Sequence, residues 1–138
     1  MDFANKFVGG GVLGWGCVQE EIRFITSPEL IVSMLFMERL DDRDAMIVTG
    51  CERYCSSRGY ADSFRFEGDF NDQTPRDSWG RRYTEVVAID AQPFNYKRLD
   101  QYKYNWLERE VCKVWKLCCS VLLIFTFSTC CFTFYKFE

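Results

Sequence analysis

The segment Gly9–Glu21, GGGVLGWGCVQEE, constrains the fold more than any other part of the chain. Three glycines stand together at its start, and two more follow at Gly14 and Gly16. A glycine cluster lets the backbone adopt positive φ and brings amides close to a ligand. Such a loop forms a seat for phosphate when it leads into a helix N-terminus. Because the run ends in the adjacent carboxylates Glu20 and Glu21, it predicts chemistry on a phosphorylated sugar.

The absence of histidine narrows the possible chemistry. None of the 138 residues is His, which excludes His-based triads, His-ligated zinc and histidine general bases. Acid–base catalysis therefore depends on Asp, Glu, Tyr, Lys or Cys. The net charge of −3 gives the chain no basic footprint for nucleic acid. Direct nucleic-acid binding is not predicted, and an anionic ligand must be held by a local site.

The eight cysteines show neither zinc-ligand spacing nor a clear disulfide framework. We therefore predict reduced thiols in an intracellular protein, and no metal site. Cys17, next to the acid pair, is interpreted as a packing residue rather than a nucleophile. The first residues, MDFANKF, contain no apolar core of a signal peptide.

The first third of the chain predicts a strand, a loop and two helices. Asp2–Val8 is expected to be the end of a strand that runs into the glycine loop. Val18–Phe24 is expected to be a short helix whose acidic residues lie near the positive end of its dipole. Ser27 is expected to cap a second helix, with Pro28 at its first position.

The remainder predicts an α/β layered domain, because strands and helices are mixed along it. Two apolar runs, Ala45–Thr49 and Thr84–Ala91, are expected to be strands, the first of them buried. Gly59–Phe70 is expected to form a strand or hairpin, and Asn71–Trp79 a polar loop. Leu99–Trp115 is polar and is expected to be helical.

Several segments, taken in order, resemble the poly(ADP-ribose) glycohydrolases. DFANKFVGGGVLGWGCVQEEIRF at Asp2–Phe24 is similar to the family signature, which pairs a glycine triplet with a downstream Gln-Glu-Glu. The resemblance covers roughly Asp2 to Leu99, and more weakly extends to Trp115. Besides the signature it includes SPELIVSMLF, TGCERY, GYADSFRF and RDSWGRRYTEVVAIDA, at Ser27–Phe36, Thr49–Tyr54, Gly59–Phe66 and Arg76–Ala91.

This resemblance implies an α/β class: a macrodomain-like α/β/α three-layer fold with a mixed sheet that binds ADP-ribose. The implied activity is hydrolysis of the ribose–ribose bonds of poly(ADP-ribose), with release of ADP-ribose and water as second substrate. No cofactor and no metal are implied. The substrates would be the polymer and ADP-ribosylated proteins. The resemblance further implies a monomer in the nucleus and cytoplasm, with a part in the regulation of DNA repair.

The resemblance also implies the site residues. Glu21 would be the catalytic acid that protonates the leaving ribose oxygen, Glu20 would bond a ribose hydroxyl, and Asp2 would be the third catalytic acidic residue. Glycoside cleavage needs a protonated carboxyl together with negative charge near an oxocarbenium-like centre. We expect the adjacent carboxylates to raise one another's pKa, so that one stays protonated near neutral pH. The resemblance implies three kinds of substrate-binding residue. Gly9, Gly10 and Gly11 would lie against the diphosphate, and Tyr60 would stack on adenine. Asn5 and Gln19 would make polar contacts with the ligand.

Plainer interpretations stand beside these assignments. Glu20 and Glu21 taken alone are typical of a solvated helix start, where acidic residues are favoured. Tyr60 could belong to the core on a strand face. Arg81 and Arg82 are interpreted as solvated or ion-paired surface residues, with contact to phosphate as the alternative.

The chain departs from the family at both ends, where the family has further strands and helices and a second glycine-rich segment. We therefore expect residues 1–115 to form a partial catalytic domain and residues 116–138 an unrelated apolar tail. Leu117–Phe134 carries no charge and would extend about 27 Å as a helix, close to the bilayer core thickness. It could be translated non-coding sequence, a membrane anchor, or a buried strand or helix. The alternative functions are a non-catalytic ADP-ribose-binding fragment and an inactive truncated product.

Overall fold

A computed structural model of the protein describes residues 1–94, 98–124 and 133–137, with side chains described as far as Cys118. Its elements follow in the order β1 (Asp2–Ala4), α1 (Gln19–Thr26), the 3₁₀ helix η1 (Pro28–Leu35), β2 (Ala45–Thr49), β3 (Cys55–Arg58), η2 (Ala61–Ser63), β4 (Arg65–Asp69), β5 (Glu85–Asp90), η3 (Arg98–Tyr102), α2 (Tyr104–Ile124) and β6 (Thr133–Phe137).

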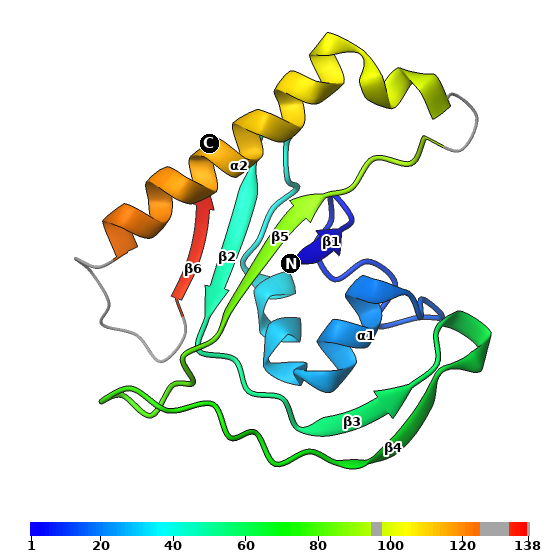
Figure 1. Cartoon of the computed structure of the whole chain (residues 1–138). Coiled ribbons are helices and arrows are strands. Elements are labelled where there is room, and N and C mark those ends of the chain that lie inside the picture. Colours follow the sequence, from blue (N-terminus) through cyan, green and yellow to red (C-terminus); the bar gives the residue numbers. More distant parts are fainter. Residues whose placement is uncertain (95–97, 125–132, 138) are drawn as a thin grey trace.

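Four strands form a mixed sheet in the order β1-β5-β2-β6 (Figure 1). β1 runs parallel to β5 and places Ala4 opposite Asp90. β2 is antiparallel to both β5 and β6. The first four residues of β2 are all buried, as expected of an apolar strand covered on both faces. The predicted strand over Ala45–Thr49 is therefore confirmed.

Helices cover the sheet on both faces, which gives three layers (Figure 1). On one face α1 and η1 pack over the main core, and on the other Leu117 of α2 packs against Ala45 and Ile47 of β2. The predicted α/β class and mixed sheet are confirmed. The main core consists of Ala4, Val8, Phe24, Leu30, Leu40, Met46, Val48, Cys51, Val86 and Ala88.

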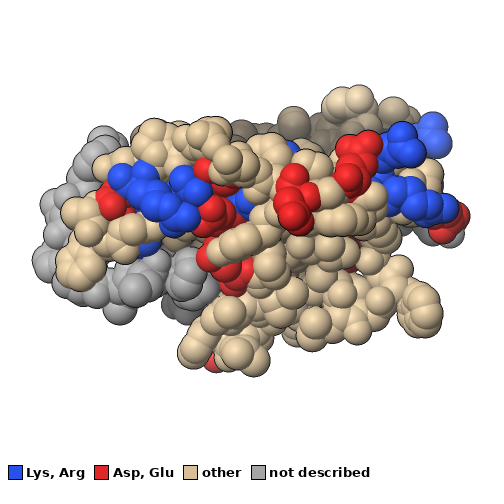
Figure 2. Space-filling view, turned by 90° about the horizontal axis from the view of Figure 1, so that it is seen from below, with Lys and Arg blue, Asp and Glu red and all other residues tan. Residues whose placement is uncertain are grey.

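A separate hairpin of β3 and β4 lies beside α1. The predicted segment Gly59–Phe70 contains only its second strand, because β3 ends at Arg58. The following loop is held by ion pairs. Arg82 contacts Glu52 at 2.5 Å, Arg76 contacts the same carboxylate, and Arg81 contacts Asp77 at 2.6 Å. The ion-paired interpretation of Arg81 and Arg82 is confirmed. Figure 2 shows basic side chains lying beside acidic ones on the face seen from below.

The second helix differs from the expectation. It begins at Pro28 as predicted, but it is a 3₁₀ helix, and the Ser27 side chain does not cap it. Ser27 is at the same time the C-cap of α1, where its N–H donates to the carbonyl of Arg23. Because the two helices abut, its hydroxyl is buried and has no hydrogen-bond partner among the described residues. Within η1, the Ser33 hydroxyl donates to the carbonyl of Leu30, a local bond that competes with a regular helix.

Part of the predicted apolar tail belongs to described elements of the fold, namely the end of α2 and the strand β6. α2 continues without a break through residues 115 and 116. The boundary expected there, between the partial catalytic domain and the apolar tail, stays a prediction. Residues 125–132, in the middle of the apolar run, lie outside the described residues, and β6 follows them. Among the helices that the structure describes, none combines the length and the apolar character that a membrane span requires.

Candidate active site

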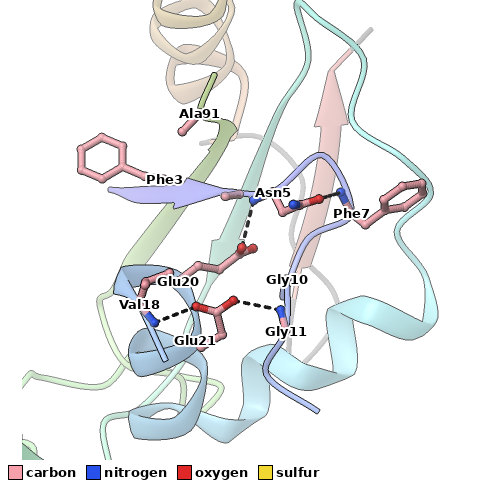
Figure 3. A pocket seen from close by; sticks show the side chains of 10 residues that line it. Phe3, Asn5, Phe7, Gly10, Gly11, Val18, Glu20, Glu21 and Ala91 are labelled. Carbon is pink, nitrogen blue, oxygen red and sulfur yellow. Dashed lines mark hydrogen bonds between the residues drawn. The ribbon is translucent and has the colours of Figure 1, made fainter. Parts of the chain in front are cut away.

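The acid pair lies in the first turn of α1 and points toward the glycine loop (Figure 3). Glu20 and Glu21 are both buried. Glu21 occupies the third helical position, from which its Oε2 accepts the N–H of Val18, the N-cap residue, at 3.0 Å. This backward bond satisfies one of the amides at the helix start. The solvated interpretation of the two glutamates is wrong, because their side chains turn into the protein.

Backbone amides hold both carboxylates from the opposite side. Glu20 accepts the N–H of Gly9 at 2.6 Å and that of Asn5 at 2.9 Å. Glu21 accepts the N–H of Gly11 at 2.9 Å. The remaining amide of the triplet, from Gly10, donates to the carbonyl of Phe7. The three amides expected to meet a diphosphate are thus bonded within the protein, two of them to the acid pair itself.

The loop requires glycine because the carboxylates occupy the space of its side chains. A Cβ on Gly10 would lie 2.6 Å from Oε1 of Glu21 and 2.7 Å from Oε2 of Glu20. Gly10 also has a φ of +48°, and Gly9 a φ of +95°, in the left-handed region that favours glycine. The glycine triplet is therefore built around the acid pair.

Asp2 completes a cluster of three acids. Its side chain is fully buried, and no donor among the described residues reaches either oxygen. Burial and the negative charge of Glu20 raise the pKa of Asp2 to about 7. Burial also raises the pKa of Glu20, against the effect of its bonds from Asn5 and Gly9. Burial, the largest single influence, raises the pKa of Glu21, but its backbone hydrogen bonds outweigh it, so the pKa falls below its usual value.

The expectation about the proton holds for Glu20, whose pKa is raised by burial and also by the charge of Glu21, and is wrong for Glu21. The carboxyls with raised pKa are Asp2 and Glu20, whereas Glu21, the expected acid, favours its ionised form. The reason is local: α1 and the glycine loop each direct an N–H at Glu21, which stabilises its charge.

A cavity of about 380 Å³ opens above the acid pair. Phe3 and Phe7 lie on opposite sides of the two glutamates (Figure 3), and both rings are largely exposed. Among the described residues, the lining contains two carboxylates and no cationic side chain. It consists of Phe3, Ala4, Asn5, Phe7, Gly10, Gly11, Val18, Glu20, Glu21 and Ala91.

The other predicted binding residues take different places. Asn5 lines the cavity, and its Oδ1 accepts the N–H of Phe7 at 3.0 Å. Gln19 does not line it, because its amide binds the backbone of Met1 and Phe3 and so secures β1. Tyr60 is exposed and also lies outside the lining. It is still tied to the site, since the next residue, Ala61, donates its N–H to the carbonyl of Cys17.

Sequence reasoning missed five uncharged residues of the cavity, namely Phe3, Ala4, Phe7, Val18 and Ala91. Val18 contributes the N–H that holds Glu21, and Ala91 follows the last residue of β5. Phe3 and Phe7 were not singled out, although they flank Asn5 in the segment DFANKF. The signal that the sequence offered for them was the position of two aromatic residues two places before and after Asn5, a predicted ligand contact.

Comparison with known proteins decides the family. The family model described as poly(ADP-ribose) glycohydrolase (PARG), Macro domain fold, matches residues 1–119. The chain belongs to the poly(ADP-ribose) glycohydrolase family. The matched residues include the whole acid cluster and glycine loop, so the cavity described above lies within the PARG-like part of the chain.

Curated relatives agree. The chain is 55% identical over 91 residues to poly(ADP-ribose) glycohydrolase 1 of Arabidopsis thaliana. The aligned residues cover 66% of this chain and 17% of that protein. It is 43% identical over 113 residues to probable poly(ADP-ribose) glycohydrolase 2 of the same plant, an alignment that covers 82% of this chain and 21% of that protein. It is 39% identical over 106 residues to poly(ADP-ribose) glycohydrolase 1 of Caenorhabditis elegans, an alignment that covers 72% of this chain and 14% of that protein. The chain thus spans less than a quarter of the length of these PARG relatives.

Proposed function

We propose that this chain hydrolyses the ribose–ribose bonds of poly(ADP-ribose) and releases ADP-ribose. The observation that carries the proposal is the acid pair itself. Glu20 and Glu21 are neighbours on α1, face one cavity and are fixed by amides of the glycine loop. Two fixed carboxyls beside a cavity are what glycoside hydrolysis requires. The family of the chain and the names of its relatives support the same substrate.

In the proposed reaction, Glu21 gives its proton to the ribose oxygen of the leaving unit as the glycosidic bond breaks. Water then adds to the anomeric carbon, and its proton returns to the site. Glu20 bonds a ribose hydroxyl and, with its negative charge, steadies the cationic sugar. General acid catalysis of this kind contributes about 10² to 10⁴ in rate.

Glu21 must acquire a proton before it can act. In the free protein its pKa lies below the usual value, because Gly11 and Val18 donate to it. A bound pyrophosphate would add negative charge and exclude water from the cavity, and both effects raise the pKa of a carboxyl. We infer that substrate binding itself protonates Glu21. Asp2, with a pKa of about 7, is a nearby group that holds a proton near neutral pH.

The second candidate function is binding of ADP-ribose without turnover. The ionised state of Glu21 in the free protein favours it, because an ionised acid delivers no proton. On this alternative the polymer would bind and would not be shortened.

Two measurements separate the candidates. The 138-residue chain is incubated with poly(ADP-ribose), and free ADP-ribose is followed by anion-exchange chromatography. Calorimetry with ADP-ribose measures binding in the same preparation. Release of ADP-ribose that disappears in Glu21→Gln supports hydrolysis, whereas binding without release supports the second candidate. Absence of both contradicts the proposal.

Proposals for the substrates, the oligomeric state and the cellular location follow from this function. We propose the polymer and ADP-ribosylated proteins as substrates, a monomer as the acting form, and the nucleus and cytoplasm as its location. Fractionation of cells that express the tagged chain tests the location, and light scattering tests the oligomeric state.

A further inference from the structure

Lys6 and Phe7 form a cation–aromatic pair at the rim of the cavity. The Nζ atom of Lys6 lies 5.7 Å from the centroid of the Phe7 ring. Phe7 lines the cavity and is nevertheless 59% exposed, so the ring borders both the cavity and solvent. Figure 3 shows it beyond Asn5, on the side of the acid pair opposite Phe3. An aromatic ring left exposed beside a ligand cavity is available for stacking.

The backbone fixes this pair in place. The Phe7 N–H donates to Oδ1 of Asn5, and its carbonyl accepts the N–H of Gly10. The carbonyl of Lys6 accepts the N–H of Leu40 at 2.7 Å. The turn that carries Lys6 and Phe7 is therefore tied to the glycine loop. Because its backbone is already ordered, binding of a ligand to this turn costs little conformational entropy.

Charge makes Lys6 distinctive at this site. As far as the structure describes the chain, the cavity lining contains the carboxylates Glu20 and Glu21 and no cation, although the proposed substrate is a polyanion. Within the described residues, Lys6 forms no salt bridge, so its ammonium is not neutralised by a carboxylate. A free ammonium at the rim would attract a phosphate that the acid pair repels.

The size of the cavity indicates which part of the substrate reaches the rim. Its volume of about 380 Å³ is near the lower end for ligand pockets, which span about 300–1,000 Å³. It cannot enclose two ADP-ribose units. In the polymer each scissile bond joins two such units, and each unit carries an adenine and a pyrophosphate. One unit must therefore extend from the cavity across its rim.

We propose that Lys6 and Phe7 form a subsite for the neighbouring, non-released unit of the polymer. Phe7 stacks on its adenine, and Lys6 contacts its pyrophosphate. This inference rests on the proposed function and adds to it a preference for polymer over free ADP-ribose. Stacking on one aromatic ring and one charge contact together give the two-unit ligand an advantage of about tenfold or more.

The test compares two ligands, ADP-ribose and its two-unit oligomer, by calorimetry. All variants are made in a Glu21→Gln background so that the oligomer is not cleaved, and circular dichroism checks that each is folded. The test variants are Phe7→Ala and Lys6→Gln. Their matched controls are Phe66→Ala, an exposed ring on β4 outside the cavity, and Lys103→Gln, an exposed lysine of the segment before α2.

We expect each test variant to weaken binding of the two-unit oligomer about tenfold more than it weakens binding of ADP-ribose. Lys6→Gln should also flatten the salt dependence of oligomer binding, because it removes a contact to phosphate. Both controls should bind both ligands as the parent does. The same substitutions in the chain that retains Glu21 should raise KM for the polymer, which gives a second reading independent of the background.

The outcomes distinguish the two proposals. If the parent binds both ligands and the test variants affect both equally, or neither, the rim subsite is wrong and the proposed function still stands. If the parent binds neither ligand, the proposed function fails and the subsite fails with it.

Discussion

A Cβ atom added to Gly16 would lie 2.6 Å from Oε1 of Glu21. The glycine loop thus approaches the acid so closely that a methyl group cannot fit between them. Gly14, two residues earlier, differs: its added Cβ would meet only the carbonyl of Gly11, at an ordinary 3.5 Å. Gly14 and Gly16 are both absent from the residues with positive φ. The contrast between them is therefore one of space alone.

Gly16→Ala should lower polymer hydrolysis by about 10²-fold, because displacement of a catalytic group by about 1 Å can cost that much. Gly14→Ala is the matched control and should retain activity within about threefold. Initial rates of ADP-ribose release measure both. Equal losses in the two variants would contradict the steric explanation and would indicate a general need for loop flexibility.

Glu21→Gln should lower turnover by about 10² to 10⁴ and still allow ADP-ribose to bind. The exchange keeps the shape of the side chain and removes the transferable proton. Calorimetry measures binding, and chromatography measures release. Glu67→Gln, on the hairpin strand β4, is the control and should change neither. Near-normal turnover of Glu21→Gln would remove Glu21 from its proposed role.

Asp2→Asn should change how stability depends on pH. The pKa of Asp2 rises from 3.8 to about 7 on folding, so between these values the native chain binds a proton that the unfolded chain has released. Stability contributed by this group is full below pH 3.8 and falls as pH rises toward 7, by about 1.4 kcal/mol per pH unit. The total loss is roughly 4 kcal/mol.

Asparagine carries no such charge, so Asp2→Asn should be more stable than the original chain at pH 7.5, and about equal to it at pH 4. Urea unfolding at the two pH values measures the difference. Equal unfolding free energies at pH 7.5 would show that Asp2 is not a strained, buried carboxylate.

The fold could be predicted where local pattern and burial agree. Ala45–Thr49 and Thr84–Ala91 are apolar runs that became the central strands β2 and β5. The 3₁₀ form of η1 could not be predicted, because it depends on how closely Ser27 joins two helices and on the burial of its hydroxyl. The pairing of β1 with β5 joins residues far apart in sequence, and no local pattern encodes it.

The acidic residues of the site could be named from the sequence, but their electrostatics could not. The structure places Asp2, Glu20 and Glu21 in one cluster, and their catalytic roles stay a prediction. The order of their pKa values depends on which amides point at which oxygen. Adjacency suggests mutual repulsion, whereas at Glu21 the hydrogen bonds from Gly11 and Val18 outweigh the effect of burial and lower the pKa. Such bonds are visible only in three dimensions.

Lys113 joins α2 to the end of β5 from a fully buried position. Its Nζ donates to the carbonyl of Asp90 at 2.7 Å and to Oε1 of Glu110 at 3.0 Å. Lys113→Met keeps the apolar stem and removes this donor to the Asp90 carbonyl. Among the described side chains, Arg109 then remains as a donor to that carbonyl, at 3.4 Å. We expect a loss of about 3 kcal/mol in unfolding free energy, because a buried acceptor loses its partner.

The matched control for this exchange is Lys103→Met, which removes an exposed ion pair with Asp100 and should cost less than about 1 kcal/mol. Urea unfolding at pH 7 measures both losses. ADP-ribose affinity is a second readout, since Ala91, next to Asp90, lines the cavity. Lys113→Met should weaken binding as the end of β5 loosens, and Lys103→Met should not. Equal, small losses of stability in the two variants would show that the buried lysine does not fasten α2 to the sheet.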